Sequence, residues 1–147
     1  MQEKTVVREA VLEDSLALTK LAWQLGHQAE AGQVRARLFD LLNRDDHKVF
    51  VAEVDGELRG WVHAFINRPL HKDTAVEIAG LVVDQNCRKM GIGRRLLDTT
   101  EDWAKTQGCD QVTLSSSLAR EGAHKFYQAI GYQLTKTQYT FKKELLK

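Results

Sequence analysis

The stretch VVDQNCRKMGIGRR, residues 82–95, joins a hydrophobic segment that predicts a strand to an amphipathic segment that predicts a helix. Gly91 and Gly93 stand where this helix begins. Glycine there lets the backbone approach a ligand closely, and the first N–H groups of a helix have no partner inside the helix. Such N–H groups, together with the positive end of the helix dipole, bind phosphate. The stretch therefore predicts a pyrophosphate site. Basic side chains lie on both sides of the glycines: Arg88, Lys89, Arg94 and Arg95.

Other known phosphate loops fit this stretch poorly. A P-loop requires Gly-Lys followed by Ser or Thr, whereas Gly93 is followed by two arginines. The dinucleotide fingerprint requires a third glycine, and Leu96 stands at its place. Two glycines alone suit a plain strand-to-helix turn among surface charges equally well. Arg88, three residues before Gly91, and the flanking strand and helix favour the phosphate site.

The rest of the chain alternates strands and helices around this stretch. Turn residues, helix ends and hydrophobic periodicity place the boundaries. We expect a central, mostly antiparallel sheet with helices on both faces, in a single mixed α/β domain over residues 1–147. The predicted strands are 5–8, 49–54, 58–66, 74–83, 110–115 and one or two within 132–145, and the predicted helices are 15–26 (with Asp14 and Ser15 as N-cap candidates), 32–43, 91–107 and 121–130.

Length and charge narrow the class of protein. The chain has 147 residues, which suits one domain, and a formal net charge of +1, which argues against a nucleic-acid or membrane-surface specialist. No apolar run is long enough to span a bilayer, and the N-terminus does not resemble a signal peptide. Two cysteines, Cys87 and Cys109, do not make a disulfide framework, and we expect Cys109 in the core and Cys87 outside the chemistry. We therefore expect a cytoplasmic protein.

Residues 88–93, Arg-Lys-Met-Gly-Ile-Gly, resemble the Arg/Gln-x-x-Gly-x-Gly/Ala motif of the GNAT superfamily of acetyl-CoA-dependent N-acetyltransferases. The likeness continues in EIAGLVV, residues 77–83, and in AHKFYQAIGY, residues 123–132, and the order of elements matches that fold along nearly the whole chain. The resemblance implies acetyl transfer from acetyl-CoA to the primary amine of a small molecule, by direct attack in a ternary complex. A protein or peptide acceptor, and a CoA-binding module without turnover, stay open as alternatives.

The resemblance also implies which residues bind acetyl-CoA. The loop amides would hold the CoA pyrophosphate beside Arg88, and the backbone of residues 81–83 would pair with the pantetheine arm. The chain departs from the family pattern at Lys89, often glycine, and at Arg120, often asparagine, whose contact Ser116 or Ser117 could replace. The expected cofactor-binding residues are Leu81, Val82, Val83, Arg88, Lys89, Met90, Gly91, Ile92, Gly93, Arg94, Ser117 and Tyr127.

Acetyl transfer to an amine needs a base, a stabilised oxyanion and an acid for the departing thiolate. Tyr127 is the expected acid, because its hydroxyl can donate a proton and the resemblance places it beside the thioester sulfur. The alternative is that Tyr127 belongs to the core stripe of its helix. Glu77 is the expected base, directly or through water, because a carboxylate in an apolar strand is partly desolvated. Its alternative is a solvent-facing strand residue, and His63 is a second candidate base.

The predictions about metals and partners rest mainly on sequence features that the chain lacks. The histidines and cysteines show no ligand spacing, so we expect no metal, and the charge balance predicts neither a nucleic-acid nor a membrane partner. By resemblance the acceptor groove lies between the first two helices and the connection before the Glu77 strand, whose mixed side chains favour a small amine. The apolar residues near the C-terminus suit either a homodimer or the core of a monomer: Tyr139, Phe141, Leu145 and Leu146.

Overall fold

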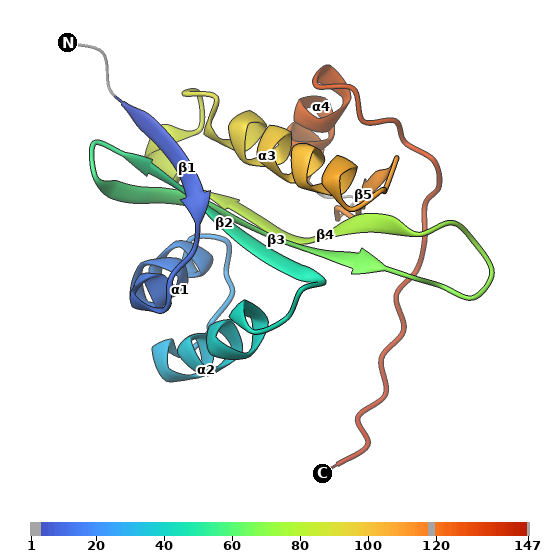
Figure 1. Cartoon of the computed structure of the whole chain (residues 1–147), viewed down its shortest axis with the longest axis horizontal. Coiled ribbons are helices and arrows are strands. Elements are labelled where there is room, and N and C mark those ends of the chain that lie inside the picture. The colour runs from blue at the N-terminus through green and yellow to red at the C-terminus, as the bar shows by residue number, and fades with distance from the viewer. Residues whose placement is uncertain (1–3, 118–119, 147) are drawn as a thin grey trace. The chain divides into compact units, whose positions relative to one another are not determined.

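The computed structural model describes residues 4–117 and 120–146 of the chain. The chain forms two compact units, residues 1–115 and residues 116–147. The first unit is a five-stranded sheet with helices, and the second holds a short helix and an extended C-terminal segment (Figure 1).

The sheet of the first unit has the strand order β1-β2-β3-β4-β5. All neighbouring strands are antiparallel except β4 and β5, which are parallel. This confirms the predicted mixed α/β fold with a mostly antiparallel sheet. The elements are β1 (Thr5–Glu9), the 3-10 helix η1 (Leu12–Asp14), α1 (Ser15–Trp23), α2 (Ala31–Leu42), β2 (His47–Val54), β3 (Glu57–Asn67), β4 (Ala75–Val83), the 3-10 helix η2 (Gln85–Cys87), α3 (Ile92–Thr106) and β5 (Val112–Leu114).

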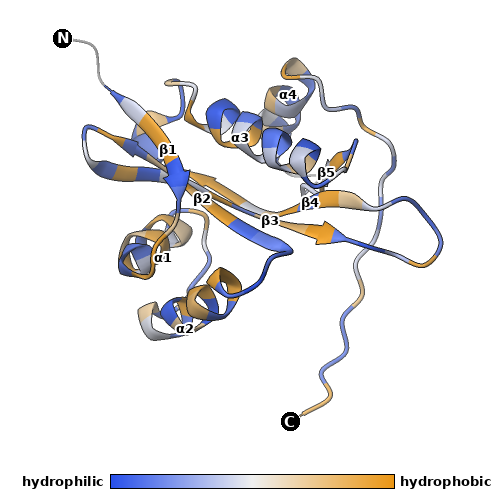
Figure 2. Ribbon diagram, viewed as in Figure 1, coloured by the Kyte–Doolittle hydropathy of each residue, from blue (hydrophilic) through white to orange (hydrophobic). Residues whose placement is uncertain are grey.

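Helix α3 covers one face of the sheet through a continuous apolar stripe (Figure 2). Six residues on one side of α3 are buried, and together with the inward residues of β3 and β4 they form the core on this side. Gly60 on β3 allows this close packing, because a Cβ there would lie 3.0 Å from Ile92 and 3.2 Å from Leu96. The buried residues of α3 are Ile92, Leu96, Leu97, Thr100, Trp103 and Ala104.

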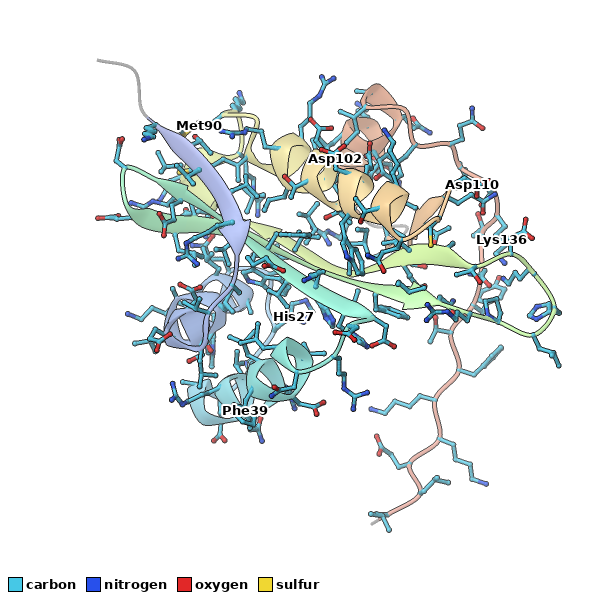
Figure 3. The ribbon with its side chains drawn as sticks, in the orientation of Figure 1. His27, Phe39, Met90, Asp102, Asp110 and Lys136 are labelled. Carbon is cyan, nitrogen blue, oxygen red and sulfur yellow. The ribbon has the colours of Figure 1, made fainter. Side chains whose placement is uncertain are left out.

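Helices α1 and α2 cover the opposite face (Figure 1). Their core is a smaller cluster of buried residues from the two helices, from β2 and from the chain after β1, with Trp61 of β3 packed against it. On the outer side of α2, Phe39 is exposed and points away from the sheet (Figure 3). The buried members of the cluster are Ala10, Leu18, Leu38, Val49 and Val51.

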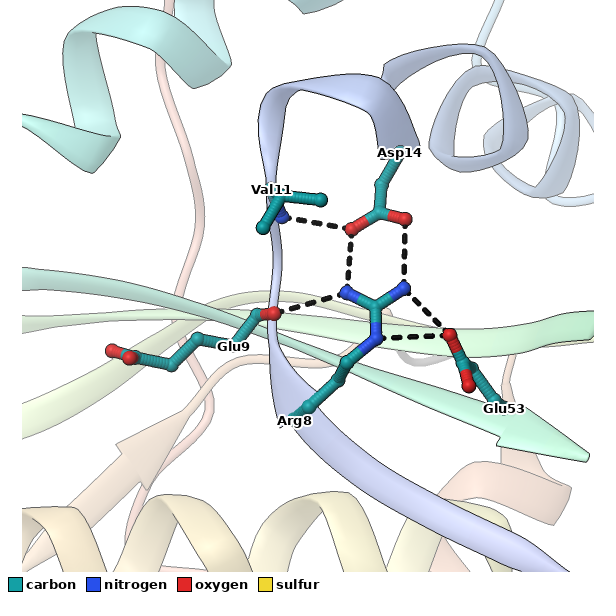
Figure 4. Close-up of polar contacts among 5 residues, drawn as sticks. All are labelled: Arg8, Glu9, Val11, Asp14 and Glu53. Atoms are coloured by element: carbon teal, nitrogen blue, oxygen red, sulfur yellow. Dashed lines mark hydrogen bonds and ion pairs between the residues drawn. The ribbon is translucent and has the colours of Figure 1, made fainter. Parts of the chain in front are cut away.

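A network of charges ties β1, β2 and η1 together (Figure 4). The Arg8 guanidinium donates two hydrogen bonds to Asp14, at 2.8 and 2.9 Å, and two to Oε1 of Glu53, at 2.9 and 2.7 Å. Asp14 is the N-cap residue of α1, as predicted, but its side chain makes no capping hydrogen bond to that helix. Its carboxylate instead accepts the Val11 N–H at 2.8 Å, because η1 precedes α1 and presents that N–H first.

The second unit contains α4 (Glu121–Ala129), whose predicted inner residues are half-buried. The Tyr127 ring packs at an angle against its neighbours there, with ring centroids 5.3 Å from Phe126 and 6.1 Å from Tyr132. The expected strand within residues 132–145 was wrong, because no described residue forms a ladder with this segment. An alternating pattern gives a strand only where a neighbouring strand accepts its hydrogen bonds. The large apolar side chains of this segment are exposed: Leu134, Tyr139, Phe141, Leu145 and Leu146.

No helix among the described residues is both long enough and apolar enough to cross a membrane.

Candidate functional site

Strand β4 is paired differently along its two edges. On one edge it pairs with β3 from Ala75 to Val83, apart from a bulge that leaves Ala79 without a partner. On the other edge β5 pairs only with residues 76–78. Among the described residues, no strand therefore pairs with those N–H and C=O groups of residues 79–83 that point toward the β5 side. An unpaired strand edge of this kind can accept an extended ligand as an additional strand.

The chain leaves β4 through a series of tight turns. The Asp84 N–H donates to Arg59 O at 2.7 Å, and the Cys87 N–H donates to Asp84 O at 2.8 Å. The Met90 N–H then donates to Cys87 O at 3.2 Å, and Met90 itself is exposed in the turn before α3 (Figure 3). These bonds bring the chain from the end of the strand to the start of the helix in one defined path.

Helix α3 begins without a side-chain cap. Gly91, at its N-cap position, has φ 76° and ψ 14°, the left-handed region that glycine adopts without strain. The Arg95 N–H donates to Gly91 O at 3.1 Å, so the N–H groups of residues 92–94 have no hydrogen-bond partner among the described residues. A Cβ at Gly91 would meet nothing within 4 Å. The helix start is thus an open set of donors, as the sequence predicted.

Positive charge surrounds this helix start. Arg88, Lys89 and Arg94 are exposed and form no ion pair with any residue that the structure describes. The first turn of α3 holds no acidic residue. Arg95 differs, because its Nη1 donates to Thr5 O at 2.7 Å and is occupied by β1. Unpaired cations at a helix N-terminus favour the binding of an anion.

Glu77 lies half-buried on the α1/α2 face of β4. It pairs across the ladder with Phe65, and His63 lies two residues along β3 on the same face. His63 Nε2 is 2.9 Å from His47 Nδ1, and the rings of the two histidines stack with centroids 5.2 Å apart. Burial, helped by the charge of His47, lowers the pKa of His63 to about 4. The two candidate bases are therefore neighbours, and His63 is neutral at pH 7.

A cavity of about 260 Å³ lies at the end of β4 where the chain enters the strand, and its lining includes neighbours of Glu77 but not Glu77 itself. Thr113 of β5 pairs with Glu77, and Ala75 lies two residues from it on the same face. The wall is mostly polar and carries one positive and one negative side chain. The lining residues are Asn67, Pro69, Lys72, Asp73, Ala75, Gln111 and Thr113.

The other predicted site residues lie in the second unit. Burial raises the pKa of the Tyr127 phenol, and the nearby Arg120 charge opposes this only in part. Ser117 is exposed, and its carbonyl lies 2.8 Å from Nε2 of His124. His124 is half-buried.

The structure thus brings together the predicted residues of the first unit. Glu77 and residues 81–83 share one strand, and the loop from Arg88 and the helix start at Gly91 follow directly. Val82 and Ile92 are buried, so only their backbone groups are available to a ligand, whereas Leu81, Val83 and Gly93 are half-buried. Among the described residues, no group of three or more His, Cys, Asp or Glu side chains is arranged to hold a metal ion.

The residues that hold the loop in place were not predicted from the sequence. Asp84 is 5% exposed, and its carboxylate accepts Arg59 Nη1 at 3.1 Å and the Asn86 N–H at 2.9 Å. The Asn86 N–H, with Arg59 and Gln24, holds the pKa of Asp84 below its usual value in spite of burial. Gly60, a glycine inside a strand, was the one local signal of a close approach behind the helix start. The other contacts join residues far apart in the sequence, and no local sequence pattern predicts them.

Comparisons with known proteins agree with this geometry. The model of the acetyltransferase (GNAT) family matches residues 12–132. An uncharacterized N-acetyltransferase of Bacillus subtilis (strain 168) is 35% identical over 91 residues, which are 62% of this chain and 64% of that protein. The chain thus spans just under two thirds of the Bacillus protein. An aminoglycoside N(6′)-acetyltransferase type 1 of Acinetobacter genomosp. 13 is 26% identical over 144 residues, 95% of this chain and 96% of that one.

The fold has close counterparts among solved structures. The aminoglycoside N-acetyltransferase AAC(6′)-Iy, in complex with CoA, has a TM-score of 0.87 at 21% identity, and 97% of each chain is covered. At that identity the likeness shows the fold alone.

Proposed function

The chain belongs to the acetyltransferase (GNAT) family, and from that premise we propose that it transfers an acetyl group from acetyl-CoA to the primary amine of a small molecule. In this proposal the amine attacks the thioester directly in a ternary complex, and no acetylated enzyme forms. Several of the relatives that extend over nearly the whole chain are named for aminoglycosides, so a polyhydroxylated amine is the first acceptor class to test.

The assignment of acetyl-CoA rests on one observation, the unpaired edge of residues 79–83 that leads into the open start of α3. CoA carries an extended arm of two amides followed by a pyrophosphate, which is the order in which the chain offers an unpaired strand edge and then an anion site. The residues present therefore fit this ligand. Residues 81–83 would pair with the arm, and the amides of residues 89–93 other than Met90, whose N–H is bonded to Cys87 O, would hold the pyrophosphate with Arg88 and Arg94.

We assign Glu77 the role of base. The carboxylate would accept the proton that the acceptor ammonium must lose before attack, directly or through a water. Its half-buried place beside the polar cavity supports this. A pKa of about 4 makes His63 a weaker base than an ordinary histidine, which favours Glu77 of the two.

We assign Tyr127 the role of acid for the CoA thiolate, as the family resemblance implies. Burial raises the pKa of its phenol, so the hydroxyl keeps its proton at pH 7 and is available to donate it. The proton from the amine and the proton to the thiolate thus pass through different residues.

The cavity beside Glu77 supports a small acceptor. About 260 Å³ of space suits a single sugar-sized or amino-acid-sized group better than an extended peptide. Amide and hydroxyl groups line it, and the Asp73 carboxylate could pair with a second ammonium of the acceptor.

An acceptor screen tests the proposal. The protein would be incubated with acetyl-CoA and panels of amino sugars, aminoglycosides, amino acids and lysine peptides, and free thiol would be measured. We expect thiol release with a hydroxylated small amine, and Tyr127→Phe should lower kcat by about 100-fold with little change in the KM of acetyl-CoA. Turnover with peptides alone would move the acceptor to proteins, and binding of acetyl-CoA without thiol release for any amine would leave a binding module.

A further inference from the structure

Gln24, the residue at which α1 ends, reaches the segment that precedes the phosphate loop. Its Oε1 accepts the Gln85 N–H at 2.9 Å, although the two residues are 61 positions apart in the sequence. The Gln24 side chain also lies near the Asp84 carboxylate and helps to lower its pKa. Because Oε1 faces the Gln85 N–H, the amide NH₂ is the group turned toward Asp84. One side chain therefore holds two consecutive residues at the point where β4 ends.

Asp84 is fixed from other directions as well. Its N–H donates to Arg59 O, and its carboxylate accepts Arg59 Nη1, so β3 holds it from the sheet side. Gln24 supplies the remaining contact, from α1, which covers the face of the sheet opposite to α3. Arg59 fixes Asp84, whereas Gln24 alone reaches onward to the backbone of Gln85.

The position of the loop depends on Asp84 and Gln85. Asp84 O accepts the Cys87 N–H, and Cys87 O accepts the Met90 N–H, so each turn is built on the one before it. Gly91 and the open start of α3 follow immediately. A shift at residues 84–85 would therefore move the loop relative to the helix start, and the two must be aligned to bind one pyrophosphate group.

We propose that Gln24 is a positioning residue for acetyl-CoA, which holds the cofactor loop in its binding geometry without contacting the ligand. The inference rests on the proposed function, because it concerns the same cofactor site. It adds that α1, the helix on the acceptor side of the sheet, sets the geometry of the cofactor loop.

The test compares two glutamines that both end a helix. Gln107 is the C-cap residue of α3 as Gln24 is of α1, but its side chain makes only a 3.4 Å contact with Thr106 beside it. Wild type, Gln24→Ala and Gln107→Ala would each be titrated with acetyl-CoA by calorimetry and melted by circular dichroism. We expect Gln24→Ala to raise the Kd of acetyl-CoA by about tenfold, with a Tm close to that of Gln107→Ala, whose Kd stays at the wild-type value.

A charge variant separates this contact from packing. Gln24→Glu keeps an acceptor for the Gln85 N–H but places a second carboxylate against Asp84, so it should weaken acetyl-CoA binding at least as much as Gln24→Ala. Simple loss of packing would not produce this result, because glutamate and glutamine have nearly the same shape.

The outcomes separate this inference from the proposed function. If wild type does not bind acetyl-CoA, the proposed function fails and this inference fails with it. If wild type binds and Gln24→Ala binds as well as Gln107→Ala, the positioning role alone is overturned. The same holds if Gln24→Glu binds acetyl-CoA as tightly as wild type.

Discussion

Two helices in the first unit begin in opposite electrostatic states. Before α1, the protein supplies its own anion: the Asp14 carboxylate accepts the Val11 N–H, and Arg8 and Glu53 complete the set of charges. At the start of α3 there is a glycine, no acidic residue in the first turn, and basic side chains without ion-pair partners among the described residues.

The difference shows which helix start contributes to stability and which can bind a ligand. Every helix start exposes N–H donors and a positive dipole end that some acceptor must satisfy. At η1, the 3-10 helix that leads into α1, the protein supplies an internal acceptor, the Asp14 carboxylate, which contributes to stability. It leaves them to an external anion at α3, which contributes to binding. Changes at the two places should therefore have separate consequences.

The largest expected effect follows from closing the α3 start. Gly91→Val should lower the affinity for acetyl-CoA by about 100-fold, because a β-branched side chain is strained at φ 76° and stands among the free N–H groups. Gly108→Val is the matched control: Gly108 also has φ 76° and would also place its Cβ in open space, so it bears the same strain away from the site. Calorimetry with acetyl-CoA measures both. Equal affinities in the two variants would show that Gly91 has no part in binding.

A smaller effect, on stability, is expected at the α1 side. Asp14→Ala should lower the free energy of unfolding by about 2 kcal/mol, because it leaves the Val11 N–H unpartnered and removes two hydrogen bonds and an ion pair from the partly buried Arg8 guanidinium, which keeps its bonds to Glu53 and Glu9 O. Asp40→Ala removes an exposed ion pair with Arg44 and should cost less than about 0.5 kcal/mol. Urea unfolding measures both, and the Kd of acetyl-CoA should stay unchanged in each. A loss of affinity in Asp14→Ala with its stability intact would contradict the separation of the two helix starts.

Two adjacent arginines sharpen the comparison further. Arg94→Ala should weaken acetyl-CoA binding by about fivefold and reduce its dependence on salt, since an unpaired cation near the anion site is removed. Arg95→Ala should change the affinity much less, because Arg95 is engaged by Thr5 O. Titrations at two ionic strengths would test this, and a larger effect from Arg95 would place the anion elsewhere.

The smallest effect concerns pH. Partial burial raises the pKa of Asp14, but the hydrogen bonds from Arg8 and the Val11 N–H, with the charge of Arg8, outweigh it and leave the pKa below its ordinary value of 3.8. A carboxyl whose folded pKa is depressed stabilises the fold above its ordinary value and loses that contribution as pH falls through the folded pKa. Wild type should therefore lose stability below about pH 4 more steeply than Asp14→Asn. Parallel curves of Tm against pH for the two proteins would rule out this linkage.

Much of the fold could be predicted because it depends on local patterns in the sequence. The six inward residues of α3, the Asp55-Gly56 hairpin turn and the glycine that opens the helix all follow from spacing or from backbone freedom. Asp55 and Gly56 both have positive φ, as the turn between β2 and β3 requires.

The contacts that could not be predicted join residues distant in sequence. Arg8 meets Glu53 and Gln24 meets Gln85 only because the sheet and its helices bring them together. The expected C-terminal strand failed for a related reason, since an alternating segment becomes a strand only through a neighbour that the sequence does not specify. The bulge at Ala79 is likewise a property of the pairing between β3 and β4.

The central claim is that the open helix start and the unpaired edge of β4 bind acetyl-CoA. Its most direct test is a calorimetric titration of the wild-type protein with acetyl-CoA, with desulfo-CoA and ATP titrated alongside. We predict that acetyl-CoA and desulfo-CoA bind, since both carry the arm and the pyrophosphate, and that ATP, which lacks the arm, does not. Failure of acetyl-CoA to bind, or binding of ATP with equal affinity, would contradict the account.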